Sequence, residues 1–261
     1  AAVEKEKRKA DRELSAARKA YERLIEESRR RVVERVESAY RVRPCYHALI
    51  DAVSGGGRSV WELEETPDAT VGVPLVPMAA APAREVAEVL SRMSGDGEPF
   101  LIERKYDGER CQLHVLPAET SGGETEIRLF SRSLDEMTIR FPEMVTAVER
   151  ALNSGDGGSS SVSSIVLDGE LCAVDTSSGI PLPFAALASR PRKGPTSEQV
   201  AATPVCFYAF DVLYHNGKST LSMPLGERRA LLRNVMMPAP GLMELAYGVE
   251  GYDAAAIEAE L

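Results

Sequence analysis

Leu101-Ile-Glu-Arg-Lys-Tyr-Asp-Gly-Glu-Arg-Cys-Gln-Leu-His114 is the segment around which the rest of this sequence is organised. Apolar residues alternate with polar ones before Lys105 and again after Asp107-Gly108, a dipeptide typical of tight turns. This pattern predicts two strands that meet at a turn, with the lysine at the end of the first strand, where its amine can face a cleft. The turn glycine would let the backbone approach a ligand closely.

Four ionisable side chains in this segment, Glu103, Lys105, Asp107 and Arg110, have the chemistry of a phosphoryl-transfer site. A neutral lysine amine is a good nucleophile toward phosphorus, and neighbouring cations or a dry environment favour the neutral form. The alternative is a charged hairpin on the surface, which would be the better interpretation of a lone Lys-x-Asp-Gly. The complete spacing Glu-x-Lys-x-Asp-Gly-x-Arg favours a reactive site.

This spacing resembles the nucleotidyltransferase domain of ATP-dependent DNA ligases, most closely the eukaryotic replicative DNA ligase I type. RNA ligases and messenger-RNA capping enzymes share the same short motif, so the motif alone indicates only the superfamily. The resemblance implies an α+β fold of antiparallel sheets flanked by helices. An all-helical N-terminal segment is expected to precede it.

Three later segments match further motifs of the family in the correct order: Phe130-Ser131-Arg132, Ile165-Val-Leu-Asp-Gly-Glu-Leu171 and Phe210-Asp211. Arg132 alone could be a solvated cation at a strand end, and an aromatic in a buried strand usually only packs. Two carboxylates in an apolar strand are costly unless paired with a cation or a metal. Four ordered motifs therefore favour a site over chance.

The resemblance implies a role for each of these residues. Lys105 would attack the α-phosphate of ATP, and AMP would then pass to a 5′-phosphate at a nick in duplex DNA, which the adjacent 3′-hydroxyl seals. Glu103 would accept from the adenine amino group, and Phe210 would stack on the base. Arg110 and Arg132 would neutralise phosphate charge, with Mg²⁺ as a cofactor beside ATP.

Glu170 would hold the ribose or the metal ion, and Asp107 and Gly108 would support the nucleophile. The cations of the loop Arg190, Arg192 and Lys193 resemble a DNA-binding segment of the family, although a solvated loop explains them equally well.

The chain divides by composition into three parts. Residues 1–53 are predicted to form a helical arm and the tail of a DNA-binding domain, residues 54–72 a linker with three consecutive glycines near its start, and residues 73–261 an adenylation domain that is incomplete at its C-terminus. The arm has a narrow apolar stripe at heptad-like spacing, including Leu14, Tyr21 and Leu24. It could contact DNA or a protein, but a solvated charged helix is the favoured interpretation.

Composition constrains the cellular setting. A content of 44% hydrophobic and 27% charged residues is ordinary for a soluble globular protein, without a membrane span or a signal-like N-terminus. The four cysteines are scattered through apolar runs, which predicts buried thiols in a reducing compartment, and the family resemblance implies the nucleus. A net charge of -9 argues against strong nucleic-acid binding, and we expect a monomer.

Two alternatives stay open at this point. An RNA ligase or capping-type nucleotidyltransferase would use the same chemistry, but the Pro-Met segment at Gly72–Met78 and the Phe-Pro-Glu segment at 141–143 argue for a DNA ligase. A non-catalytic DNA- or protein-binding fragment is the other alternative. It gains support from the acidic net charge. It is also supported because two later features of the family, a strand with two lysines and an oligonucleotide-binding barrel, do not follow within this sequence.

Overall fold

The computed structural model describes residues 2–45, 49–50, 54, 68–93, 99–117, 125–152 and 162–260. The chain separates into two compact units, residues 1–67 and residues 68–261. Residues 55–67 of the predicted linker and residues 46–48 and 51–53 of the predicted tail lie outside the described residues. Among those described, no helix is both long and apolar enough to cross a membrane.

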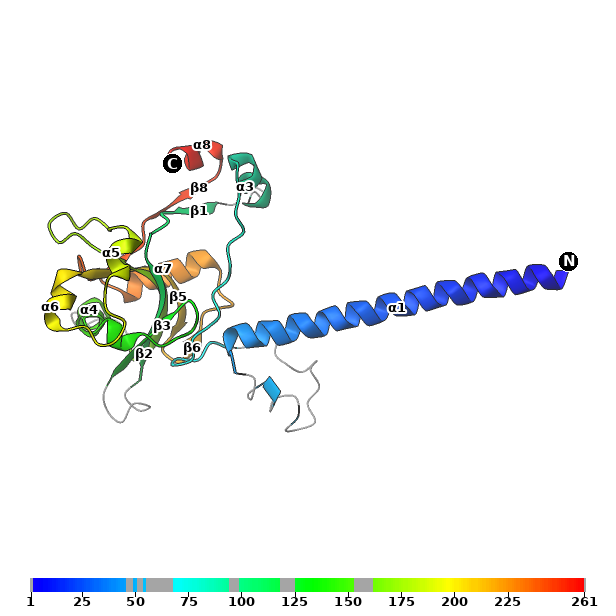
Figure 1. Ribbon diagram of the computed structural model, residues 1–261. Coiled ribbons are helices and arrows are strands. Elements are labelled where there is room, and N and C mark those ends of the chain that lie inside the picture. Colours follow the sequence, from blue (N-terminus) through cyan, green and yellow to red (C-terminus); the bar gives the residue numbers. More distant parts are fainter. Residues whose placement is uncertain are drawn as a thin grey trace. The chain divides into compact units, whose positions relative to one another are not determined.

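The first unit consists mainly of α1 (Ala2–Val42), a helix of 41 residues (Figure 1). Its side chains are largely solvated, with Leu14, Tyr21 and Leu24 all more than 60% exposed. Pairs at i and i+4, such as Arg31 with Glu27, support such an exposed helix by a few tenths of a kcal/mol each. The predicted helix therefore exists.

The helical structure predicted for residues 1–53 is interrupted at Pro44. The helix ends at Val42, and the residues 43–45 are irregular, because a proline disfavours helical backbone at the residue before it. Cys45 lies in this irregular segment and is exposed, so the prediction that all four cysteines are buried fails there. Cys111, Cys172 and Cys206 are buried free thiols, as expected.

The second unit is built on a six-stranded sheet with the order β3-β2-β4-β5-β6, in which β7 pairs with β5. Neighbouring strands are antiparallel, except that β5 and β7 are parallel. The strands are β2 (Glu109–Leu116), β3 (Glu126–Ser131), β4 (Ile165–Ala173), β5 (Val205–His215), β6 (Lys218–Ser219) and β7 (Met243–Leu245).

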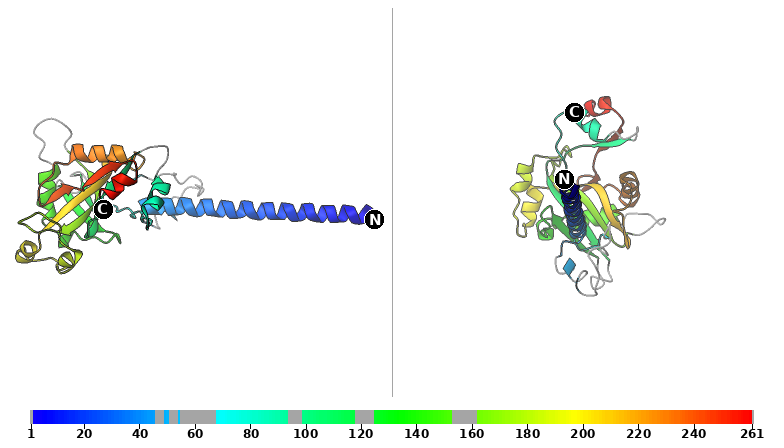
Figure 2. Two further views of the ribbon diagram at one scale, coloured as in Figure 1. Left: turned by 90° about the horizontal axis from the view of Figure 1, so that it is seen from above. Right: turned by 90° about the vertical axis from the view of Figure 1, so that its right-hand side faces the viewer.

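A separate two-stranded sheet pairs β1 (Phe100–Glu103) with β8 (Gly248–Gly251). With α3 (Val86–Met93) and α8 (Ala254–Glu258) it forms a small lobe beside the main sheet, visible from two directions in Figures 1 and 2. The remaining helical segments are η2 (Thr138–Arg140), α4 (Met144–Leu152), α5 (Phe184–Ala188), α6 (Ser197–Ala202) and α7 (Leu225–Val235). The predicted α+β class, antiparallel sheets flanked by helices, is confirmed.

The predicted hairpin across Asp107-Gly108 is wrong, because β1 and β2 belong to different sheets. Phe100 pairs with Gly251 of β8, while β2 pairs with β3 and β4. Gly108 is needed for another reason: a Cβ there would lie 2.7 Å from Cys172 Sγ and 2.9 Å from Glu170 Cγ. The glycine thus allows the chain to cross tightly over β4 as it passes from one sheet to the other.

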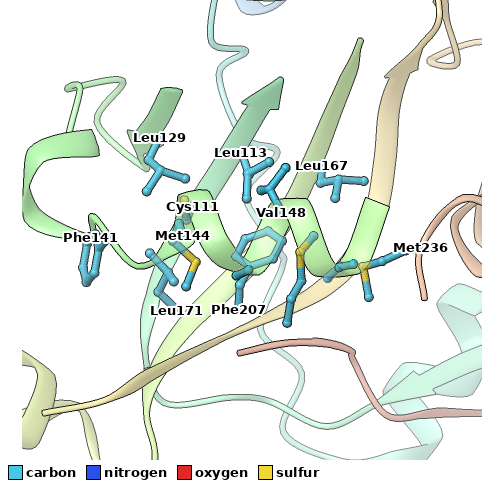
Figure 3. Close-up of a cluster of buried hydrophobic side chains, with 14 of the residues drawn as sticks. Cys111, Leu113, Leu129, Phe141, Met144, Val148, Leu167, Leu171, Phe207 and Met236 are labelled. Atoms are coloured by element: carbon cyan, nitrogen blue, oxygen red, sulfur yellow. The ribbon is translucent and has the colours of Figure 1, made fainter. Parts of the chain in front are cut away.

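One face of the main sheet carries the hydrophobic core. Alternate residues of β2, β4 and β5, among them Leu113, Leu167 and Phe207, pack against α4 and α7. Figure 3 shows Met144 and Val148 of α4 lying among these strand side chains. Each fully buried side chain of this size contributes about 1.5–3 kcal/mol.

The other face of the sheet presents the intervening polar residues, and the segment around residues 69–75 covers part of it. Gln112 binds Leu75 twice, accepting from its amide at 2.8 Å and donating to its carbonyl at 2.6 Å. The amide of Gly72 donates to Nδ1 of His114 at 3.0 Å. Burial lowers the pKa of His114 to about 3, so this histidine is a neutral structural acceptor. Arg110, Asp168 and Glu170 of the predicted site lie on this same face of the sheet.

Candidate nucleotide-binding site

The pairing of β2 with β4 brings the predicted cations to the predicted acid. Arg110 lies directly opposite Glu170 in the register, and the amide of Gly108 is hydrogen-bonded to the Glu170 carboxylate. Burial raises the pKa of Glu170 to about 7, although Arg110 and Lys105 both act in the opposite direction. Lys105, Arg110 and Glu170, which are separated by up to 65 positions, therefore share one electrostatic environment.

Lys105 opens onto a pocket of about 570 Å³ that it shares with Glu103. Both residues belong to the segment that leaves β1, and both are exposed. The pocket is lined by Ile102, Glu103, Arg104, Lys105, Tyr247, Ile257 and Glu260. The predicted nucleophile and the predicted base-reading carboxylate are thus accessible from the same cavity.

Arg110 is held by Asp168, the second carboxylate of the β4 motif. Its Nε and Nη2 donate to the two Asp168 oxygens at 3.1 and 2.8 Å, a bidentate geometry that fixes the guanidinium plane. Burial raises the pKa of Asp168, and the bonds from Arg110 oppose this effect. The guanidinium carbon of Arg110 lies 5.4 Å from the ring centroid of Phe210, so the predicted stacking residue adjoins the same cluster.

Arg229 is a residue of the site that the sequence did not single out. From α7 it donates to Glu103 Oε1 at 2.9 Å, to the carbonyl of Phe210 at 2.6 Å and to that of Ala246 at 3.2 Å. Burial raises the pKa of Glu103, Arg229 lowers it, and Asp211 raises it further. The only signal in the sequence was the pair Arg228-Arg229 after Pro224, which is typical of an ordinary charged helix. The fold then buries Arg229.

The segment carrying the nucleophile is anchored on both sides. The Tyr106 ring stacks on Tyr208 of β5 with centroids 4.3 Å apart, and its hydroxyl accepts from the amide of Tyr247 at 3.1 Å. Asp107 accepts from the amide of Phe184, the first residue of α5, at 3.0 Å. Asp107 therefore holds the backbone that presents Lys105, which suits its predicted supporting role.

Arg132 follows β3 at the end of the sheet where β2 begins. Ser131 pairs with Cys111, which places Arg132 near the level of Arg110 along the neighbouring strand. Its side chain is exposed at that end. A contact between Arg132 and a nucleotide stays a prediction.

The three cations of the predicted DNA-binding loop differ in their exposure to solvent. Arg190 is only 2% exposed, donates to both carboxylate oxygens of Glu143 and lies 5.1 Å from the Phe141 ring centroid. It is therefore a buried structural cation, and its predicted exposure to DNA is corrected. Arg192 and Lys193 are exposed.

Comparison with solved structures finds a mycobacterial DNA ligase D complexed with ATP and MES. The match has a TM-score of 0.42 at 25% sequence identity and covers 62% of this chain and 44% of that chain.

Curated relatives include DNA ligase 1 of Arabidopsis thaliana, 34% identical over 218 residues, and the DNA ligase of Pyrobaculum calidifontis, 34% identical over 203 residues. The matches cover 84% and 78% of this chain, respectively. This chain spans 25% of the length of the first relative and 31% of the second. The sequence model of the ATP dependent DNA ligase domain matches residues 77–261, well over half of the chain and all of the residues that form the site described above. The chain belongs to the ATP dependent DNA ligase domain family.

Proposed function

We propose that this chain carries out the adenylation chemistry of an ATP-dependent DNA ligase, with Lys105 as the nucleophile. The observation that carries the proposal is the shared environment of Lys105, Arg110 and Glu170, with Glu103 in the same pocket as the lysine. In a member of this family, that combination supplies a nucleophile, a fixed cation, a half-buried acid and a base-reading acceptor. ATP is the nucleotide that the family name implies.

The first step forms a bond between Lys105 Nζ and the α-phosphorus of ATP and breaks the bond to pyrophosphate, while the amine loses its proton to solvent. Arg110, whose orientation is fixed by Asp168, is placed to balance charge on the phosphate, because transfers of this type depend mostly on positioning and electrostatics. Phe210 would stack on adenine, and Arg132 would reach the phosphate side of the nucleotide.

The residues present fit a divalent cation only in part. Among the described residues, no group of three or more His, Cys, Asp or Glu side chains could hold a metal ion. Glu170 is a half-buried carboxylate with a pKa raised to about 7, and a bound cation would favour its ionised form. Glu170 would therefore hold Mg²⁺ jointly with the phosphates of ATP, where the ion would neutralise phosphate charge.

The whole reaction extends this proposal to a DNA substrate. AMP would pass from Lys105 to a 5′-phosphate at a nick, and Arg192 and Lys193 are exposed cations available for DNA contacts. We propose a role in nuclear DNA replication, repair and recombination, as a monomer whose α1 contacts DNA or a protein. The eukaryotic relatives named DNA ligase 1 support the nuclear assignment.

Incubation with α-labelled ATP and Mg²⁺, followed by a denaturing gel, tests the first step. Label should attach to the chain, and Lys105→Ala should reduce it by at least about a hundredfold, because the bond-forming atom is removed. Lys218→Ala is the matched control, since Lys218 is an exposed lysine on β6 and should leave labelling unchanged.

Three outcomes separate the alternatives. Label that survives Lys105→Ala would show that the assigned nucleophile is wrong. Labelling from GTP instead of ATP would favour a capping-type enzyme. ATP binding without covalent label would favour a non-catalytic role for this chain.

A further inference from the structure

Arg229 connects two groups that the proposed function assigns to the adenine base. It contacts the Glu103 side chain, which projects from the small sheet, and the backbone of Phe210, which belongs to the main sheet. It also binds the carbonyl of Ala246, ahead of β8. A single side chain from α7 thus joins one strand of each sheet and the segment between β7 and β8.

The burial of Arg229 makes these contacts stronger than they would be in water. Its side chain is 7% exposed, whereas that of Glu103 is 37% exposed and open to the pocket. A buried guanidinium must satisfy its donors locally, and charge-assisted bonds to a carboxylate are about twice as strong as neutral ones. The carboxylate of Glu103 is therefore held through Oε1, while its side chain also lines the cavity.

We propose that Arg229 is a positioning residue that sets the base specificity of this site by fixing the Glu103 carboxylate and the Phe210 segment relative to each other. The proposal rests on the adenylation function proposed above, and Arg229 acts through Glu103 without touching the nucleotide. A fixed carboxylate accepts from the amino group of adenine, while guanine presents a carbonyl at the same position. A site built around such an acceptor penalises the wrong base strongly.

Charge is the second part of the role of Arg229. Burial and Asp211 both raise the pKa of Glu103, and Arg229 opposes them. Without this cation, the carboxylate would take up a proton at a higher pH and would lose acceptor strength. The other ionisable side chains around Glu103 in the pocket are Arg104, Lys105 and Glu260.

The test compares the unaltered chain with two variants. Arg229→Gln keeps a hydrogen-bond donor but loses the charge, and Arg229→Lys keeps the charge but loses the planar set of guanidinium donors. Arg233→Gln, an exposed arginine on the same helix, is the matched control. ATP and GTP affinities are measured between pH 5 and 8, and the titration midpoint of Glu103 is followed by the NMR shift of its carboxyl carbon.

Arg229→Gln should weaken ATP binding by about tenfold or more, reduce the preference for ATP over GTP and raise the Glu103 midpoint. Its ATP affinity should therefore begin to fall at a higher pH than in the unaltered chain. Glu103→Gln combined with Arg229→Gln should weaken ATP binding by less than the sum of the two single losses, because the two changes share the interaction between Arg229 and Glu103. A purely structural arginine would give additive losses and no shift of the midpoint.

Failure of this proposal can be told apart from failure of the proposed function. If the unaltered chain did not bind ATP, the adenylation function would be wrong, and the specificity role with it. If ATP bound with a Glu103-dependent preference that Arg229→Gln left intact, only the positioning role would be overturned. Should Arg229→Gln fail to fold, Arg229→Lys carries the test: ATP affinity should fall at an unchanged Glu103 midpoint, and unchanged affinity would overturn the role.

Discussion

Glu170 changes its protonation state near neutrality, because burial outweighs the attraction of Arg110 and Lys105 and raises its pKa to about 7. The folded state binds this proton more tightly than the unfolded chain, whose glutamates titrate near 4.5. The resulting contribution to stability is present below about pH 4.5 and is lost as the pH rises through 7.

Glu170→Gln should therefore raise the melting temperature relative to the unaltered chain more at pH 8 than at pH 5. Allowing for solvent screening of a half-buried group, the difference should be about 1 kcal/mol, or about 2–4 °C. Thermal unfolding of both chains at the two pH values measures it. Glu149→Gln, an exposed carboxylate on α4, should show no such change. An equal shift at both pH values would place Glu170 in a more solvated environment.

Gly169 shows how closely the strands of the main sheet pack at the site. A Cβ at this position would lie 2.6 Å from Cε2 of the Phe207 ring and 2.7 Å from the carbonyl oxygen of Tyr208. Phe207 is fully buried, so neither group can move away freely. The glycine between Asp168 and Glu170 therefore keeps β4 close to β5 and lets the two carboxylates face the polar side.

Gly169→Ala should destabilise the chain by about 1–3 kcal/mol or more, because added atoms in a filled core force displacement of their neighbours. Gly226→Ala is the matched control: it lies in α7 with open space around it, and it should stabilise by about 0.5–1 kcal/mol. Denaturant unfolding gives both values. An unchanged midpoint for Gly169→Ala would mean that β4 and β5 separate easily.

The charge of the whole molecule opposes its proposed DNA substrate. A net charge of -9 repels phosphates on average, and of the three cations predicted for DNA contact, Arg190 is occupied by Glu143. Arg192 and Lys193 are exposed, and they offer only a small basic surface in the described part of the second unit. We therefore expect a weak affinity for DNA that depends mainly on Arg192 and Lys193.

The dissociation constant for duplex DNA should lie at or above about 10⁻⁵ M at physiological salt, in the non-specific range. Changing Arg192 and Lys193 together to Glu should weaken binding further. The slope of log affinity against log salt concentration should become shallower by the equivalent of about two phosphate contacts. Fluorescence anisotropy between 50 and 200 mM salt measures both effects. Nanomolar binding by the unaltered chain would contradict this expectation.

The sequence by itself marked the residues that we predict to carry the chemistry. The spacing around Lys105, the Asp-Gly-Glu run at β4 and the Phe210-Asp211 pair are local patterns, and local chemistry marks them without coordinates. Strand alternation also predicted the faces of β2, since the side-chain period of a strand is fixed. The long helix α1 followed from composition in the same way.

Only the tertiary structure decided which of these elements meet. A strand does not specify its partner, so the sequence joined β1 to β2, whereas the fold pairs β1 with β8 across nearly 150 positions. Arg190 and Arg229 look alike in sequence as helix or loop cations, yet long-range packing buries one against Glu143 and the other against Glu103. Burial makes the difference: a charge removed from water must find its partner, and that partner is known only once distant segments have been brought together.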